Sequence, residues 1–419
     1  MKRIKILFFS NAPITMDYVS GTGNWVVSLL ERLERFTSLQ LFVAFHDNKC
    51  EELVTMSYNE LTLFRIPTNT RKGKIGRLLD NWTNVDRYDN SESYYKNIIA
   101  EIEPDIIQIF GLESPFIRIL HWETERIVIH IQGLLAAISF KYYPRFTGFE
   151  LIANMPLIKL LKGNCVLKDL SNTKKHLVME REIYSKIQHV LGRTDWDRRC
   201  LQAMAPQAIY HHCQEIMRSQ FYTAQWEPKT SIKKIIYTTI RDAAVKNVDM
   251  IFETSRILDL YNSDFRYEWR IAGVSHNDIT PRIMRKRGLL TPNIKLLGII
   301  DAEQIINEML NAGLFVYPSA IENSSNAVQE AKLLGIPILC TYAGGMSSII
   351  THNVTGILIS EGDPYSMAGA ILEMFHDYQH SAELGRNARI SALKENDPNI
   401  VIKQLLEAYS NILKQDIIE

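Results

Sequence analysis

Two glutamates, Glu322 and Glu330, flank the expected start of a helix in the C-terminal half of the chain. The run Asn323-Ser-Ser-Asn326 between them follows an apolar strand and offers several good helix N-caps. The free backbone N–H groups of a first helical turn attract anions, phosphate in particular. Carboxylates on either side can bind hydroxyl groups. The segment therefore suits a phosphorylated sugar, held by its phosphates and its hydroxyls together.

A simpler interpretation stays open, because carboxylates near a helix N-terminus also stabilise the helix through its dipole. The sequence that follows favours binding: Gly344-Gly345 comes after the strand Ile338–Cys340, and another strand begins at Gly356. Paired glycines let backbone approach a ligand closely. Together these blocks resemble the Glu-x7-Glu motif, the glycine-rich turn and the NG-x-L segment of retaining glycosyltransferases with the GT-B fold, family 4 in particular.

This resemblance implies an α/β fold of two Rossmann-like domains that face a cleft, the second of which holds the donor. We expect an acceptor-side domain over 1–225, a nucleotide-sugar-binding domain over 226–395 and, over 396–419, a final helix that crosses back to the first domain. Alternating apolar strands and helical stretches agree with parallel sheets covered on both faces. The expected strands are Ile4–Phe9, Leu39–Phe45, Asp105–Phe110, Ile127–Ile131, His189–Leu191, Ile235–Thr239, Tyr267–Ala272, Ile294–Leu297, Leu314–Tyr317, Ile338–Cys340 and Gly356–Ile359. The expected helices include Asn24–Arg35, Val248–Tyr261, Ser366–Asp377 and Ile400–Leu413.

Cationic residues follow the strand Ile235–Thr239, where Arg241 and Lys246 resemble the family's clamp on the donor phosphates. Ile240 and Asn247 replace the glycines usual in that loop, and without the resemblance an Arg and a Lys in a loop are ordinary surface charges. By the same resemblance Glu322 positions the transferred sugar as a catalytic residue. The further donor-binding residues it implies are Gly273, Ser324, Ser325, Asn326, Ala327 and Glu330.

The N-terminal half of the chain contains fewer candidate donor-binding residues. Gly21 and Gly23 resemble the family's glycine loop against the donor phosphates. A dinucleotide-binding fingerprint is the rival, but Gly21 lies eleven residues beyond Ser10 and Val26 occupies the place of the third glycine. Arg193, in the segment after His189–Leu191, is a third candidate phosphate cation.

A strand in this half ends in Ile129-His130-Ile131-Gln132-Gly133. In many family members the residue before that glycine is a histidine that touches the reacting sugar; here it is Gln132, which can hydrogen-bond but cannot supply a proton. His130 lies two residues earlier on the same strand face. Both are candidate catalytic residues, and a satisfied core histidine is the alternative for His130.

The composition of the chain bears on its partners, its compartment and its cofactors. The 47 lysines and arginines balance the 47 aspartates and glutamates, so the protein has no net positive charge that would attract nucleic acid. The five cysteines are widely spaced without CxxC pairs, which favours a reducing, cytoplasmic compartment over disulfides or a zinc site. No stretch approaches a membrane span, and the resemblance implies no metal and no cofactor besides a UDP- or GDP-linked sugar donor.

Basic residues interleave with aromatic and aliphatic ones between Lys141 and Lys175, a pattern that suits an anionic membrane surface or a lipid-linked acceptor. A helical insertion packed on the N-terminal domain is the alternative. Three functions remain: a transferase to a glycan or lipid-linked acceptor in bacterial surface polysaccharide synthesis, a nucleotide-sugar epimerase of the same fold, and a non-catalytic sugar-nucleotide or glycan-binding protein.

Overall fold

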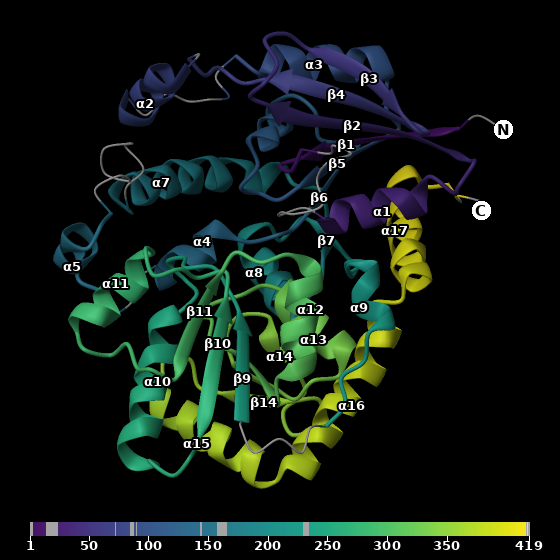
Figure 1. The fold of residues 1–419 in the computed structure, drawn as a ribbon. Helices are drawn as coiled ribbons and strands as arrows, with labels where there is room; N and C mark the ends of the chain where they lie inside the picture. Colours follow the sequence, from purple (N-terminus) through teal and green to yellow (C-terminus); the bar gives the residue numbers. More distant parts are fainter. Residues whose placement is uncertain are drawn as a thin grey trace. The chain divides into compact units, whose positions relative to one another are not determined.

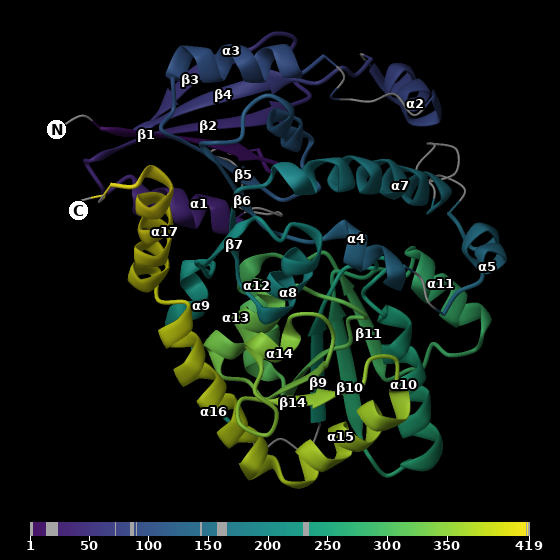
Figure 2. The same cartoon turned by 180° about the vertical axis from the view of Figure 1, so that it is seen from behind.

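The computed structural model describes residues 3–13, 24–71, 73–83, 88, 90–142, 145–156, 166–228, 234–415 and 417. The chain forms two compact units. Unit 1 consists of 1–137, 158–216 and 398–419, and unit 2 of 138–157 and 217–397. Each is built around one twisted, mainly parallel sheet with helices on both faces (Figures 1 and 2).

Unit 1 has an eight-stranded sheet in the order β3-β4-β2-β1-β5-β6-β7-β8, in which only the β3–β4 pair is antiparallel. The strands are β1 (Ile4–Ser10), β2 (Leu39–Asp47), β3 (Val54–Tyr58), β4 (Leu61–Pro67), β5 (Ile106–Phe110), β6 (Ile127–His130), β7 (His189–Gly192) and β8 (Ile209–His212). The helices are α1 (Asn24–Leu33), α2 (Gly73–Thr83), α3 (Glu92–Ile102), η1 (Pro115–His121), α4 (Leu135–Ile138), α7 (Val166–Ile183), η3 (Tyr184–Lys186), α8 (Asp195–Met204) and α17 (Pro398–Leu413).

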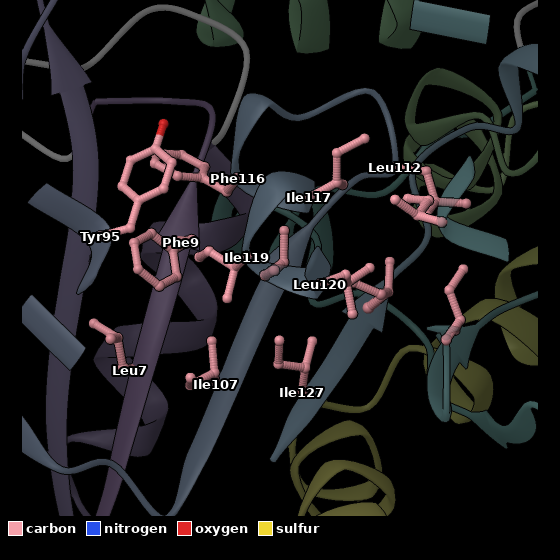
Figure 3. Close-up of a cluster of buried hydrophobic side chains, with 14 of the residues drawn as sticks. Leu7, Phe9, Tyr95, Ile107, Leu112, Phe116, Ile117, Ile119, Leu120 and Ile127 are labelled. Atoms are coloured by element: carbon pink, nitrogen blue, oxygen red, sulfur yellow. The ribbon is translucent and has the colours of Figure 1, made fainter. Parts of the chain in front are cut away.

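The central strand β1 alternates its side chains between two cores. Leu7 and Phe9 enter the core with Tyr95 of α3 and Phe116 of η1, which Figure 3 shows on one side of the sheet. Ile6 and Phe8 enter the opposite core, where α1 and α17 cover the sheet. This period of two places every second residue of β1 on the same face, so both faces must be covered by helices. The final helix α17 supplies part of that cover.

Unit 2 has a six-stranded parallel sheet in the order β11-β10-β9-β12-β13-β14. The strands are β9 (Lys234–Thr239), β10 (Tyr267–Ala272), β11 (Ile294–Gly298), β12 (Leu314–Tyr317), β13 (Ile338–Thr341) and β14 (Ile357–Ile359). The helices are η2 (Ser139–Lys141), α5 (Gly148–Ala153), α9 (Ser219–Thr223), α10 (Val248–Tyr261), α11 (Ile279–Lys286), α12 (Ala302–Asn311), α13 (Asn326–Leu334), α14 (Met346–Ile349), α15 (Pro364–His376) and α16 (Tyr378–Glu395).

The main departure from the sequence-based expectation is the segment 138–157, which we placed in the N-terminal domain and which the structure places in unit 2. Ion pairs explain this: Lys141 binds Glu361 at 3.0 Å, Arg145 lies 3.4 Å from Asp249 and Arg287 lies 2.5 Å from Glu150. The unit boundary falls at 216/217 rather than 225/226. Strands β3, β4 and β8 were missed, β3 because its residues are mostly exposed and lack an apolar run.

Candidate functional site

The predicted donor residues of unit 2 gather where its strand order reverses. From β9 the chain first adds β10 and β11 on one side of the sheet, then returns to add β12, β13 and β14 on the other. In open parallel sheets, ligands bind outside the carboxyl ends of the strands at such a switch point. The loops that leave β9, β12 and β13 at that edge carry Lys246, Glu322 and Gly344 respectively. The topology therefore brings three separate sequence blocks to one place.

The loop after β9 is held in shape at both of its ends. Gly273, at φ +85°, allows backbone contact with the loop's start: a Cβ there would lie 2.4 Å from the Ile240 carbonyl oxygen. At the other end Asn247 adopts φ +47°, a left-handed conformation that asparagine tolerates better than most residues. The substitution of the family's glycine by asparagine is thus compatible with the same turn. Within this loop the Arg241 side chain is exposed.

Lys246 and Glu322 form an ion pair, although they lie in loops after different strands. Tyr317, the last residue of β12, donates a hydrogen bond to Glu322 Oε2 at 2.9 Å and lies 3.0 Å from Lys246 Nζ. Burial disfavours the charged ammonium, but the Glu322 carboxylate outweighs it and holds the pKa of Lys246 above its ordinary value. Lys246 is therefore a fixed positive charge at the switch point.

The start of α13 is capped by one of the residues that the sequence offered as N-caps. Ser325 is the N-cap, and its hydroxyl accepts a hydrogen bond from the Val328 N–H at 3.4 Å. The N–H groups of Asn326 and Ala327 precede the first intrahelical bonds of this helix. Ser324 is buried beside them. The helix start thus has the geometry of an anion site, and phosphate binding there stays a prediction.

Glycines after β13 position Glu322. The Gly345 N–H donates to the Glu322 carbonyl at 2.8 Å. A Cβ on Gly344, where φ is +58°, would lie 2.2 Å from that same carbonyl oxygen. The Gly-Gly turn, predicted to approach a ligand, therefore also packs directly on the backbone of the candidate catalytic glutamate.

Gly344→Ala should lower both stability and nucleoside diphosphate affinity, because the new methyl group must displace the Glu322 backbone. Gly288→Ala is the matched control, since Gly288 has φ +72° and a Cβ added to it would meet nothing within 4 Å. The left-handed conformation alone should cost Gly288→Ala about 1 kcal/mol of unfolding free energy. Gly344→Ala should cost at least twice as much in urea unfolding. Equal costs and unchanged affinity would show that the close contact does not constrain Glu322.

The Glu330 carboxylate forms an ion pair with Arg218, a partner that the sequence did not indicate. Arg218 donates to both of its carboxylate oxygens, at 2.7 and 2.8 Å. Burial raises the pKa of Glu330, while Arg218 opposes that shift. Any ribose that binds Glu330 must share its oxygens with this guanidinium. The ribose role stays a prediction, and the contacts show a buried ion pair between Glu330 and Arg218.

In unit 1, His130 lies in the core at the carboxyl end of β6. Its Nδ1 is 3.3 Å from Gln108 Nε2, and Gln108 Oε1 accepts a hydrogen bond from Tyr409 of α17 at 2.5 Å. Burial, and next the charge of Arg193, lower the pKa of His130 to about 3. The imidazole is therefore neutral at physiological pH and can act on a sugar only as a neutral hydrogen-bonding group.

His130→Gln should flatten the acid branch of the stability profile. In the unfolded chain this imidazole is protonated once the pH falls below its ordinary pKa of 6.5. In the folded protein it is protonated only when the pH falls to its lowered pKa of about 3. Stability is therefore lost as pH falls through that window, by up to about 1.4 kcal/mol per pH unit. Denaturant unfolding of wild type and variant at several pH values between these limits measures the difference. Parallel profiles would mean that His130 titrates in the folded state.

Gln132 and Arg193 meet at a buried carboxylate. Gln132 Nε2 donates to Glu215 Oε1 at 3.1 Å, and Arg193 Nη1 lies 2.5 Å from Glu215 Oε2. Arg193 also donates to the Ile131 carbonyl at 3.2 Å, so its charge is balanced within unit 1. Its proposed contact with donor phosphates stays a prediction. Gly21 and Gly23 lie outside the described residues.

Three site residues were absent from the sequence-based prediction: Tyr317, Arg218 and Glu215. Tyr317 could have been found as the polar end of a buried strand directly before the candidate loop. Glu215 follows β8 at the carboxyl edge of the unit 1 sheet, a position that favours function in parallel sheets. Arg218 lies 112 residues from Glu330, and no local pattern indicates that pairing.

Comparison with known proteins shows which family and which relatives this chain resembles. Residues 224–391 match the family model described as glycosyl transferases group 1. The amylovoran biosynthesis glycosyltransferase AmsK of Erwinia amylovora is 26% identical over 178 residues, which cover 41% of this chain and 43% of that protein. The capsular polysaccharide biosynthesis glycosyltransferase CapM of Staphylococcus aureus is 25% identical over 126 residues, 30% of this chain and 33% of that protein. The matches therefore span less than half of these relatives.

Solved structures resemble the chain over nearly its whole length. Sucrose-phosphate synthase from Thermosynechococcus elongatus has a TM-score of 0.69 at 14% identity, covering 98% of this chain and 100% of that one. Anabaena HepE in complex with UDP and glucose has a TM-score of 0.61 at 14% identity, and the match covers 98% of this chain and 100% of that one. At such identities the likeness shows the fold alone. It confirms the expected GT-B fold of two Rossmann-like units.

Proposed function

From the match of residues 224–391 to the glycosyl transferases group 1 family, and from the GT-B fold of the chain, we propose that this protein transfers a sugar from a nucleotide diphosphate sugar. The observation that carries this proposal is the convergence of Lys246, Glu322 and the α13 N-terminus at the switch point of unit 2. A cation and helix N–H groups suit a diphosphate, and a carboxylate beside them suits sugar hydroxyls.

The chemistry follows from charge. When the glycosidic bond to the donor breaks, negative charge develops on the departing diphosphate, and fixed positive groups stabilise it. Lys246 is fixed by Glu322 and Tyr317, while Arg241 is exposed and free to close on the ligand. Glu322 orients the sugar through its hydroxyls. We further propose retention of the anomeric configuration, with the sugar transferred to the face from which the diphosphate leaves and without a resident metal ion.

For the acceptor we propose a glycan or lipid-linked saccharide of bacterial surface polysaccharide synthesis, bound by unit 1. The named relatives AmsK and CapM support this class, since both are described as polysaccharide biosynthesis glycosyltransferases. Across the described residues, no helix combines the length and apolar character needed to cross a bilayer. We propose that the protein acts at the cytoplasmic face of a membrane, in contact with its surface.

Incubation of the protein with UDP-, GDP- and ADP-linked sugars, with and without lipid-linked saccharide acceptors, tests this function. A transferase releases nucleoside diphosphate and forms an acceptor glycoside whose anomeric configuration NMR spectroscopy can assign. An epimerase changes the donor sugar with no acceptor present. Donor binding without either product would support the non-catalytic function. Inversion at the anomeric carbon would refute retention while leaving transfer intact.

A further inference from the structure

Asn247, the residue after Lys246, anchors the loop that follows β9 through its side chain. It is 4% exposed, and its Nδ2 donates a hydrogen bond to Glu361 Oε1 at 3.0 Å. The other oxygen of that carboxylate accepts a hydrogen bond from Lys141 Nζ at 3.0 Å. Glu361 lies in the loop between β14 and α15, and Lys141 lies in the segment 138–157. A glycine, the residue usual in the family at this place, has no side chain to make the contact.

Lys246 lies between two anchored positions of this loop. On one side, the Val245 carbonyl accepts a hydrogen bond from the Ala320 N–H at 2.9 Å, in the loop after β12. On the other side, the Asn247 side chain holds the loop to Glu361. A group that stabilises developing charge acts best when its position is fixed before the reaction. The two anchors therefore fix the backbone from which the Lys246 ammonium reaches the switch point.

The segment 138–157 packs against the same loop. A small cavity in unit 2 has Arg145 and Phe146 of this segment on its wall, together with Ala243 and Asn247 of the loop. Helix α5, which belongs to the segment, lies beside α11 of the same unit (Figures 1 and 2). In sequence the segment lies between two stretches of unit 1. An insertion in the sequence of unit 1 thus contacts the loop after β9.

We propose that Glu361 and Lys141 are positioning residues for Lys246, which they hold through Asn247. Glu361 fixes the amide of Asn247, and Lys141 binds the carboxylate oxygen that this amide leaves free. Both act on the reaction through the loop rather than by contact with the donor. The proposal rests on the proposed function in one respect, that Lys246 stabilises the departing diphosphate.

Asn247→Gly tests the proposal, because glycine adopts the left-handed conformation at φ +47° freely and the change removes only the side-chain contact. It should lower kcat for sugar transfer about tenfold and weaken nucleoside diphosphate binding about threefold, since Lys246 loses its fixed position. Asn59→Gly is the matched control, because Asn59 is also left-handed, at φ +49°, and is exposed in unit 1. This control should leave kcat and affinity unchanged.

A second set of variants tests whether the contacts act as one chain. Glu361→Ala should reproduce the losses of Asn247→Gly, and the double variant should lose no more than either single variant, because both changes break one contact. Lys141→Ala should lower kcat by a smaller factor, and should have no effect when Glu361 is already alanine. Urea unfolding of each variant checks that it is folded under the conditions of the assay.

Additive losses in the double variant would overturn the proposal. So would a wild-type kcat in Asn247→Gly when Lys246→Ala loses about 100-fold, and that result would leave the transferase site intact. Unchanged kcat in both variants would remove Lys246 from the reaction and the positioning role with it. If wild type transfers no sugar, nucleoside diphosphate affinity becomes the measurement for the same variants. Equal affinity in wild type and Asn247→Gly, or no binding by wild type, would then overturn the proposal.

Discussion

Replacing Lys246 by alanine should lower the rate of sugar transfer about 100-fold, the scale expected when a fixed group that stabilises developing charge is removed. The ammonium is held by Glu322 and Tyr317, so its charge is already in position before the donor binds. Its removal also leaves the Glu322 carboxylate without its cation. The loss should therefore appear in kcat as well as in KM. Steady-state kinetics of nucleoside diphosphate release measures both.

Lys234→Ala is the matched control for this variant. Lys234 begins β9, at the opposite end of the strand from the Lys246 loop, and its ammonium lies 4.7 Å from the centroid of the Phe265 ring. This control should keep kcat close to that of wild type. A Lys246→Ala enzyme with unchanged kcat would remove the lysine from charge stabilisation, and an equal loss in both variants would indicate a general effect on unit 2.

Arg218→Ala should destabilise the protein by about 3 kcal/mol, the cost of leaving a buried carboxylate without its partner. Glu330 is 6% exposed, and Arg218 supplies two hydrogen bonds to it. Without the guanidinium, burial would raise the pKa of Glu330 further, so the variant should recover stability as pH falls toward that pKa. Urea unfolding at neutral and acidic pH measures this change.

The double variant Arg218→Met with Glu330→Gln separates pairing from packing. Because it removes both charges, it should be more stable than Arg218→Ala. If Arg218→Ala costs no more than a surface substitution, the pair does not stabilise unit 2.

Strands β12 and β13 of unit 2 were predictable because they are short apolar runs buried on both faces. Helix α10 begins and ends at the predicted residues Val248 and Tyr261, and β12 covers the predicted Leu314–Tyr317. Strand β3 was missed because this mostly exposed antiparallel edge strand carries no such run. The assignment of 138–157 to unit 2 depends on ion pairs with residues more than 100 positions away, which periodicity does not encode.

The sequence predicted which segments form the candidate site better than it predicted which side chains pair with one another there. Family-like spacing indicated Lys246, Glu322 and the Ser325 cap, and the topology explains why they meet. Tyr317 and Arg218 escaped prediction because each acts through a partner on another loop or helix. Asn247 shows how a departure from the family pattern can preserve geometry, since it takes the left-handed conformation expected of glycine.

The central claim is that the switch point of unit 2 binds the diphosphate of a sugar donor. Calorimetric titration of UDP, GDP and ADP into wild type and Arg241→Ala tests it most directly, because Arg241 is exposed and its loss should not disturb the fold. One nucleoside diphosphate should bind wild type, and Arg241→Ala should weaken it by ~1–3 kcal/mol, while Arg256→Ala, on the exposed side of α10, should not. Absence of binding by all three nucleotides, or equal affinity in all three proteins, would contradict the account.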